Sequence, residues 1–209
     1  MSTNTNLWVN DDHVEEYLVQ REAFPHRDEA YGVVLEVMPE RVERVLDLGT
    51  GDGDLLRRVL AARPAATGIG TDFNLGMLER AQERFNGDHR AEFVTYDFND
   101  PWPSLGRFDV IVSAFAIHHV TDERKRSIYS DIYAALVPGG TFVNLEHVAS
   151  PSAQLHDEFL EAMHIEEDTS NMLTPVEPQL EWLRAIGFRD VDCIWKWREL
   201  SVLFGRKAR

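Results

Sequence analysis

Short apolar runs alternate with amphipathic segments along the chain from Val42 onward. The apolar runs predict strands at residues 44–48, 67–71, 92–96, 108–113 and 140–146. Between these runs, apolar residues recur every three or four positions, which places them on one face of each intervening helix. Strands that alternate with helices are typical of βαβ units, so we expect a parallel sheet with helices on both faces.

The second half of the chain contains clear breaks between elements. Residues 138–140 read Pro-Gly-Gly, which we expect to end a helix near Val137 and to begin the next strand. Apolar spacing over residues 155–163 predicts another helix. The polar stretch 166–178 that follows is either a lid or specificity element or a plain connection.

The last part of the chain predicts a helix followed by a hairpin. Leu180, Leu183 and Ile186 lie on one helical face, and Gly187 ends this helix. Apolar and polar residues then alternate over 190–198, as in a half-buried strand, and 200–204 is close enough to pair with it. An antiparallel pair therefore follows the parallel core.

An acidic residue and three glycines follow the first predicted strand. Residues 45–53 read Val-Leu-Asp-Leu-Gly-Thr-Gly-Asp-Gly, a buried strand that turns sharply into a helix. Glycine permits positive φ and lets a ligand lie directly on the backbone. Asp54 stands where a dinucleotide-binding fingerprint has its last glycine, and Asp52 adds another carboxylate. Two acids would repel a pyrophosphate and suit a cationic ligand, although they could also simply favour the start of the helix.

This segment resembles the glycine-rich loop of class I S-adenosylmethionine-dependent methyltransferases, and the resemblance spans most of residues 42–204. It implies an α/β fold with a Rossmann-like, doubly wound, seven-stranded sheet of order 3-2-1-4-5-7-6, whose last strand is antiparallel. It also implies a helical cap over the active site in residues 1–40 and a cofactor-binding domain in residues 41–209. The implied cofactor is S-adenosyl-L-methionine, which leaves as S-adenosyl-L-homocysteine.

The resemblance also assigns the cofactor contacts. They are Asp47, Gly49, Thr50, Gly51, Gly53, Asp72, Phe73, Met77, Asp97, Phe98, Ser113 and Ala114. Asp72 would accept hydrogen bonds from both ribose hydroxyls, and NAD would need the same contact. Asp97 would accept a hydrogen bond from the adenine amino group. Alternatives stay open, because Asp97 could cap a turn, Asn74 is a plausible helix N-cap, and Phe73 and Met77 could be core residues.

Candidate catalytic residues follow the fourth and fifth strands. His118 is our leading general base or substrate hydrogen-bond partner, and Glu146 and His147 reach the same sheet edge. His118 and His119 could instead orient the loop, which is the interpretation we favour for His119. We expect no metal site, because adjacent histidines cannot easily direct both rings at one ion.

The predicted cap offers weaker candidates for contacts to the substrate or to the cofactor's carboxylate. They are Tyr17, His26 and Arg27, with His118 as a further substrate contact.

The composition of the chain indicates which classes of partner and which compartment to expect. The chain has 209 residues, with 21 Lys and Arg against 36 Asp and Glu, a net charge of -15 that disfavours nucleic acid. One cysteine, Cys193, fits a reducing cytoplasm, and we expect a cytoplasmic protein without a secretory signal or membrane span. The oligomeric state is open.

The sequence thus predicts methyl transfer, in line, to an O, N or C nucleophile of a small molecule. The alternatives are a tRNA methyltransferase, an adenosylmethionine-using cyclase that transfers no methyl group and, least favoured, an NAD-dependent oxidoreductase.

Overall fold

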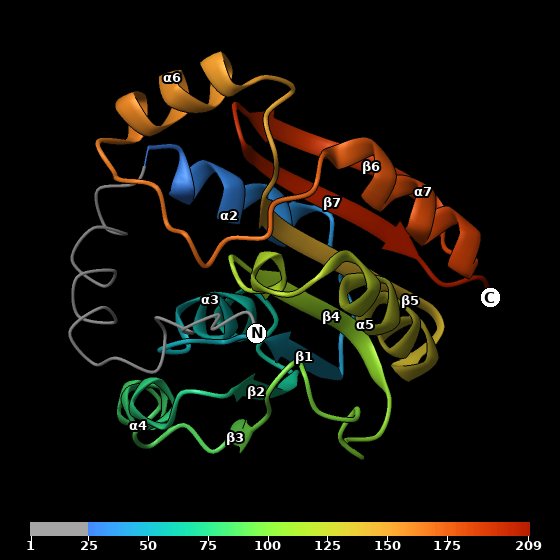
Figure 1. Cartoon of the computed structure of the whole chain (residues 1–209). Coiled ribbons are helices and arrows are strands. Elements are labelled where there is room, and N and C mark those ends of the chain that lie inside the picture. The colour runs from blue at the N-terminus through green and yellow to red at the C-terminus, as the bar shows by residue number, and fades with distance from the viewer. Residues whose placement is uncertain (1–24) are drawn as a thin grey trace.

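A mixed sheet of seven strands forms the centre of the protein in this computed structural model, which describes residues 25–209 (Figure 1). The strands are β1 (Arg44–Leu48), β2 (Thr67–Asp72), β3 (Ala91–Thr95), β4 (Phe108–Ala114), β5 (Leu136–His147), β6 (Arg189–Trp197) and β7 (Leu200–Arg206). Their order is β3-β2-β1-β4-β5-β7-β6, and β7 runs antiparallel to both of its neighbours. The predicted fold class and strand order are confirmed.

Helices cover both faces of this sheet (Figure 1). They are α2 (Arg27–Glu36), α3 (Asp54–Ala62), α4 (Leu75–Arg84), the 3-10 helix η2 (Ile117–His119), α5 (Asp122–Ala135), α6 (Ala153–Met163) and α7 (Val176–Ile186). Val45 and Val143 pack with α2 and α3, whereas their neighbours Leu46 and Phe142 pack with α5 and α7. Successive side chains of a strand point to opposite faces, so a strand covered by helices on both faces buries apolar residues at neighbouring positions.

The prediction for residues 138–140 is wrong in detail. Helix α5 ends at Ala135, and β5 already begins at Leu136, which is buried and pairs with Phe108. The next pair in register is Val110 with Thr141, so the Pro-Gly-Gly segment forms an irregular bulge inside β5. Sheet pairing of a buried leucine extends the strand back past the proline, which local breaker rules do not anticipate.

Helix α7 also begins earlier than expected. It starts at Val176, so Pro178 lies in its first turn rather than in the preceding loop. A proline is tolerated there because the first N–H groups of a helix have no intrahelical partner. The helix ends as predicted, with Gly187 at φ 118 as its C-cap.

Of the predicted helical cap, the structure describes α2. Ala30, Tyr31 and Val34 of this helix are buried, and they join the core cluster that also contains α3 and the sheet. Tyr17 lies outside the described residues, and the division of the chain at residue 40 stays a prediction. No helix within residues 25–209 is both long enough and apolar enough to span a membrane.

Candidate active site

A cavity of about 390 Å³ lies at the carboxyl ends of β1 to β4. This is the sheet edge at which open α/β folds bind ligands, and the volume suits a small molecule. The predicted cofactor contacts that line it are Asp47, Gly49, Thr50, Gly51, Asp72, Phe73, Met77, Asp97, Phe98 and Ala114. Gly53 and Ser113 are not among its lining residues.

The glycines of the β1 loop have different neighbours. A Cβ on Gly49 would lie 2.2 Å from Cβ of Ala116, so the loop after β4 packs directly on this backbone. A Cβ on Gly51 would meet nothing within 4 Å, and its φ of +54 lies in the left-handed region. Gly53 instead packs against Ala81 of α4 and begins α3. Only the first two glycines therefore shape the cavity.

Asp47 is a carboxylate that is 1 % exposed at the base of the cavity. Its Oδ2 accepts a hydrogen bond of 2.7 Å from Oγ1 of Thr50. Its buried Oδ1 has no hydrogen-bond partner within residues 25–209. Burial raises the pKa of Asp47 to about 7, and the charge of Asp72 adds to this rise. A buried acceptor of this kind fits a ligand that carries an ammonium group.

Asp72 ends β2 and faces the same cavity. Its carboxylate accepts from the backbone N–H groups of Gly51 and Asn74, each at 2.9 Å. Burial raises the pKa of Asp72, while these two N–H donors favour its ionised form. The neighbouring Asn74 caps α4 as predicted, because its Oδ1 accepts a hydrogen bond from the backbone N–H of Met77. Two backbone donors thus hold the Asp72 carboxylate at the cavity, and its ribose contact stays a prediction.

Asp97 and Phe98 follow β3. Oδ1 of Asp97 accepts from the backbone N–H of Asn99 at 2.8 Å, so this residue caps a turn and lines the cavity at once. The two interpretations left open by the sequence are therefore compatible. The ring of Phe98 packs edge-on against Tyr96 at 5.8 Å, and both rings line the cavity.

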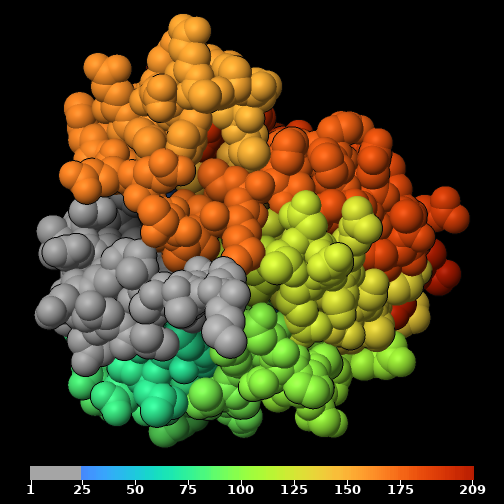
Figure 2. All heavy atoms as spheres, viewed as in Figure 1, coloured from blue at the N-terminus to red at the C-terminus, as the bar shows by residue number. Residues whose placement is uncertain are grey.

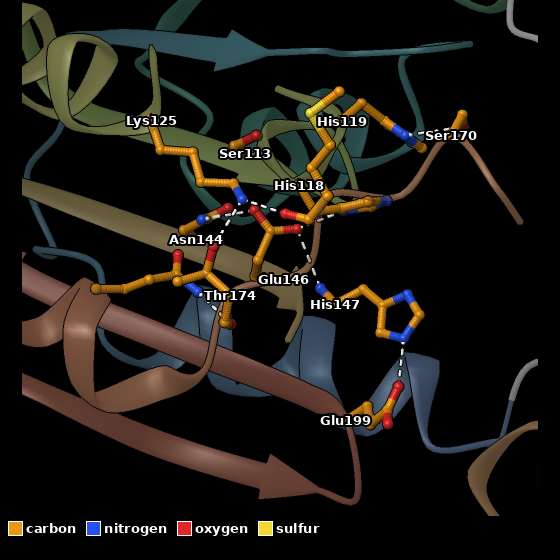
Figure 3. Close-up of polar contacts among 12 residues, drawn as sticks. Ser113, His118, His119, Lys125, Asn144, Glu146, His147, Ser170, Thr174 and Glu199 are labelled. Atoms are coloured by element: carbon orange, nitrogen blue, oxygen red, sulfur yellow. Dashed lines mark hydrogen bonds and ion pairs between the residues drawn. The ribbon is translucent and has the colours of Figure 1, made fainter. Parts of the chain in front are cut away.

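The histidines after β4 lie differently from the expectation. His119 lines the cavity, whereas His118 is buried behind it and is not a lining residue. Nδ1 of His118 lies 2.6 Å from Oε1 of Glu146, whose Oε2 accepts from Asn144 at 3.1 Å (Figure 3). Burial lowers the pKa of His118 well below its usual value and raises that of Glu146 to about 7. This pair therefore supports the η2 turn from beneath the cavity.

His119 presents a neutral imidazole to the cavity. Burial, and secondarily the neighbouring His118, lower its pKa to about 3. Its Nδ1 lies 3.3 Å from Oγ of Ser170, a residue of the 166–178 stretch that also lines the cavity (Figure 3). A ring with so low a pKa acts as a hydrogen-bonding group near neutral pH rather than as a stored proton.

His147 and Glu146 do not line the cavity either. The His147 ring points away, and its Nε2 lies 2.7 Å from Oε2 of Glu199 in the turn between β6 and β7 (Figure 3). Nδ1 of His156 on α6 lies 3.0 Å from the same carboxylate. These contacts join α6 to the sheet edge. Within residues 25–209, no group of three or more His, Cys, Asp or Glu residues could hold a metal ion.

Of the two described candidates from the predicted cap, one lines the cavity and the other does not. Arg27 lines the cavity, donates to the hydroxyl of Tyr31 at 2.8 Å and lies 3.6 Å from Oδ2 of Asp54. His26 instead pairs with Glu29 on the surface and packs against Trp197.

Several lining residues were not assigned as cofactor, catalytic or substrate contacts from the sequence. They are Tyr31, Tyr96, Phe115, Ala116, His119, Ser170 and Met172. For His119 the only sequence signal was its position after β4. For Ser170 and Met172 the only sequence signal was the polar composition of the 166–178 stretch. That composition fits a lid or specificity element and a plain connection equally well.

Comparison with known proteins finds methyltransferases, both among sequence relatives and among solved structures. Residues 45–140 match the family model of a methyltransferase domain. An uncharacterized methyltransferase of Oceanobacillus iheyensis is 33% identical over 57% of this chain and 53% of its own. The demethylmenaquinone methyltransferase of Thermus thermophilus is 33% identical over 60% of this chain and 55% of its own. The chain spans about half the length of the curated relatives it matches.

Solved structures show the same fold at low identity. An O-methyltransferase family protein from Burkholderia thailandensis aligns with a TM-score of 0.76 at 19% identity, over 96% of this chain and 61% of that one. The phosphoethanolamine N-methyltransferase 2 of Haemonchus contortus, solved with S-adenosyl-L-methionine, gives a TM-score of 0.75 at 16% identity, over 100% of this chain and 61% of that one. The strand order and the match of residues 45–140 agree with each other, and both support a methyltransferase domain of the class I, S-adenosylmethionine-dependent kind.

Proposed function

We propose that this protein transfers a methyl group from S-adenosylmethionine to a nucleophilic atom of a small molecule. The observation that carries the proposal is that His119 lines the same cavity as the three predicted cofactor carboxylates. These are Asp47, Asp72 and Asp97. When bound, S-adenosylmethionine supplies an electrophilic methyl group on a sulfonium. Asp47 and Asp72 would hold its ammonium and ribose groups, and Asp97 with Phe98 would hold the adenine.

The side of the cavity formed by His119 and Ser170 would receive the acceptor. A neutral imidazole can accept a hydrogen bond from a hydroxyl or amine and so orient the attacking lone pair. Alignment of two reactants supplies much of the barrier reduction in such displacements. Because the pKa of His119 is about 3, the ring orients the acceptor, and the released proton passes to solvent or buffer. The side-by-side placement of His119 and the cofactor elements supports this role.

Two relatives suggest acceptors to test first. By their names, they act on demethylmenaquinone and on phosphoethanolamine. The net charge of -15 favours a small acceptor over RNA, and gel-shift with tRNA at low salt tests that alternative directly.

Binding and product analysis test the proposal. Calorimetric titration with S-adenosylhomocysteine beside NAD should give binding of the former alone. Incubation with S-adenosylmethionine and each acceptor should release S-adenosylhomocysteine and a methylated product. Release of methylthioadenosine would indicate the cyclase, and binding of NAD alone would refute the methyltransferase.

His119→Phe tests the acceptor side. The variant keeps a ring and loses both nitrogens, so kcat/KM should fall about tenfold, as expected for a lost hydrogen bond of up to ~1.5 kcal/mol. Affinity for S-adenosylhomocysteine should stay within about threefold, a difference below ~1 kcal/mol. The matched control is His26→Phe, on a histidine that does not line the cavity. Equal activity of the two variants would contradict the role of His119.

A further inference from the structure

Two adjacent basic residues in the first turn of α5 reach to two different walls of the cavity. Arg124 donates to the backbone carbonyls of Phe98 and of Asp100, the latter at 2.8 Å. Lys125 donates to the carbonyl of Met172 and, at 2.7 Å, to Oγ1 of Thr174. One helical turn therefore contacts both the loop after β3 and the segment that precedes α7.

The segment that Lys125 holds is residues 168–174, which we call the strap. Ser170 and Met172 of the strap line the cavity. The backbone N–H of Met172 donates to the carbonyl of His118 at 2.9 Å, and Ser170 lies beside His119. In the space-filling view, the orange atoms after α6 lie against the yellow-green atoms of the α5 region (Figure 2). The strap is thus the wall that faces the η2 turn.

Lys125 is an unusual residue to find at this place. It is 1 % exposed, and burial lowers the pKa of its ammonium although Asp122, at 3.2 Å, favours the charged form. A buried ammonium is costly unless all its hydrogens are bonded, and here Asp122, Met172 and Thr174 supply three acceptors. Figure 3 shows the Lys125 ammonium beside Thr174 and close to Glu146. Two of the three bonds that satisfy the charge, those to Met172 and Thr174, also hold the strap.

Arg124 makes the corresponding contacts on the other wall. It donates to the Tyr96 hydroxyl at 3.2 Å, in addition to the carbonyls of Phe98 and Asp100. Tyr96, Asp97 and Phe98 all line the cavity where we place the adenine. Arg124 does not contact the strap in any hydrogen bond found among residues 25–209.

We propose that Lys125 is a positioning residue for the acceptor side of the active site, and that Arg124 positions the cofactor side. This inference rests on the proposed function, since it assigns the strap to acceptor binding. Lys125 acts through Ser170 and Met172, which it holds against the cavity and against His119. Loss of its ammonium should release the strap and leave the cofactor wall in place.

The test compares Lys125→Met with Arg124→Met in the full-length protein. Hydrogen–deuterium exchange over residues 168–174 should rise more than tenfold in Lys125→Met and stay unchanged in Arg124→Met. Calorimetry with S-adenosylhomocysteine should show the reverse, with Kd within threefold for Lys125→Met and at least tenfold higher for Arg124→Met. For any acceptor that the wild type methylates, Lys125→Met should raise its KM with the KM for S-adenosylmethionine unchanged.

Two further variants guard against a general loss of folding. Thr174→Val keeps the Lys125 ammonium and removes one of its three acceptors, so it should raise exchange over 168–174 to a smaller extent. Glu123→Gln, on an exposed residue of the same turn, is the matched control and should change neither readout. Circular dichroism confirms that each variant is folded before it is compared.

The outcomes separate the two proposals. If Lys125→Met leaves hydrogen–deuterium exchange over 168–174 unchanged, Lys125 does not position the strap. If it weakens binding of S-adenosylhomocysteine as much as Arg124→Met does, the two residues do not have separate roles. If the wild type binds no S-adenosylhomocysteine, the proposed function fails, and the exchange measurement still decides whether Lys125 fixes the strap.

Discussion

Replacement of Asp47 by asparagine should stabilise the unliganded protein and weaken its cofactor binding. The residue is 1 % exposed, and burial raises its pKa from 3.8 to about 7. At pH 8 the native protein therefore contains an ionised carboxylate in an unfavourable site. Asparagine is neutral and nearly isosteric, and its amide oxygen can still accept from Thr50 as Oδ2 of Asp47 does.

The magnitude follows from the difference in pKa. Between 3.8 and about 7 the folded protein binds a proton at Asp47 that the unfolded chain does not bind. The free energy of unfolding of the wild type should therefore fall by up to ~1.4 kcal/mol per pH unit over this range because of this group. The stabilisation of Asp47→Asn should grow from nearly zero at the acidic end to about 4 kcal/mol at most above pH 7, since the shift spans about three pKa units.

Urea denaturation of both unliganded proteins at pH 5, 6, 7 and 8 measures this difference. Glu146, whose pKa is also raised to about 7 by burial, is present in both proteins, so its contribution cancels. Titration with S-adenosylhomocysteine at pH 8 should give a Kd at least tenfold higher for the variant, because a charge-assisted hydrogen bond is worth about 1.5–3 kcal/mol. A variant that is less stable than the wild type at pH 8, or pH curves that run parallel, would refute the reasoning.

The remaining predictions concern the β1 loop and Asp72. Gly49→Ala should lower the free energy of unfolding by about 2–4 kcal/mol, since its Cβ would meet Ala116 at 2.2 Å and its φ is +68. Gly51→Ala adds only left-handed strain of about 1–2 kcal/mol, because its Cβ has open space, and equal urea midpoints for the two variants would contradict the packing argument. Asp72→Ala should weaken S-adenosylhomocysteine more than tenfold, or by about 1.4 kcal/mol or more, in calorimetry; unchanged affinity in a folded variant would remove the ribose assignment.

The fold was predictable because its signals are local. Apolar runs with breaks between them marked each strand of the sheet, and the glycine loop marked where the first strand turns into α3. The resemblance to a known family then supplied the strand order, which periodicity alone does not contain. The errors lie where a distant partner decides an element's end, as when pairing of Leu136 with Phe108 extends β5 past the Pro-Gly-Gly segment.

The candidate site was predictable on its cofactor side. Asp47 is near the end of β1, Asp72 ends β2 and Asp97 follows β3, and the carboxyl ends of parallel strands meet at one edge of the sheet. Residue type and position in the chain were therefore enough to bring these carboxylates to one cavity. Gly53 and Ser113 are the exceptions. Gly53 packs against Ala81, which depends on how α3 and α4 pack, and the Ser113 hydroxyl donates to the carbonyl of Leu48.

The wall of the cavity that contains His119 and Ser170 was decided by tertiary structure. His118 and His119 are neighbours in sequence, and only the η2 turn, with the first ring buried against Glu146, places the second at the cavity. The contact of Lys125 with Thr174 joins residues 49 positions apart. The sequence by itself determined the strands, the glycine turn and the acidic edge, since these depend on local periodicity and backbone freedom. Which of the two histidines lines the cavity depended on burial and long-range hydrogen bonds, and these form only when the whole chain has packed.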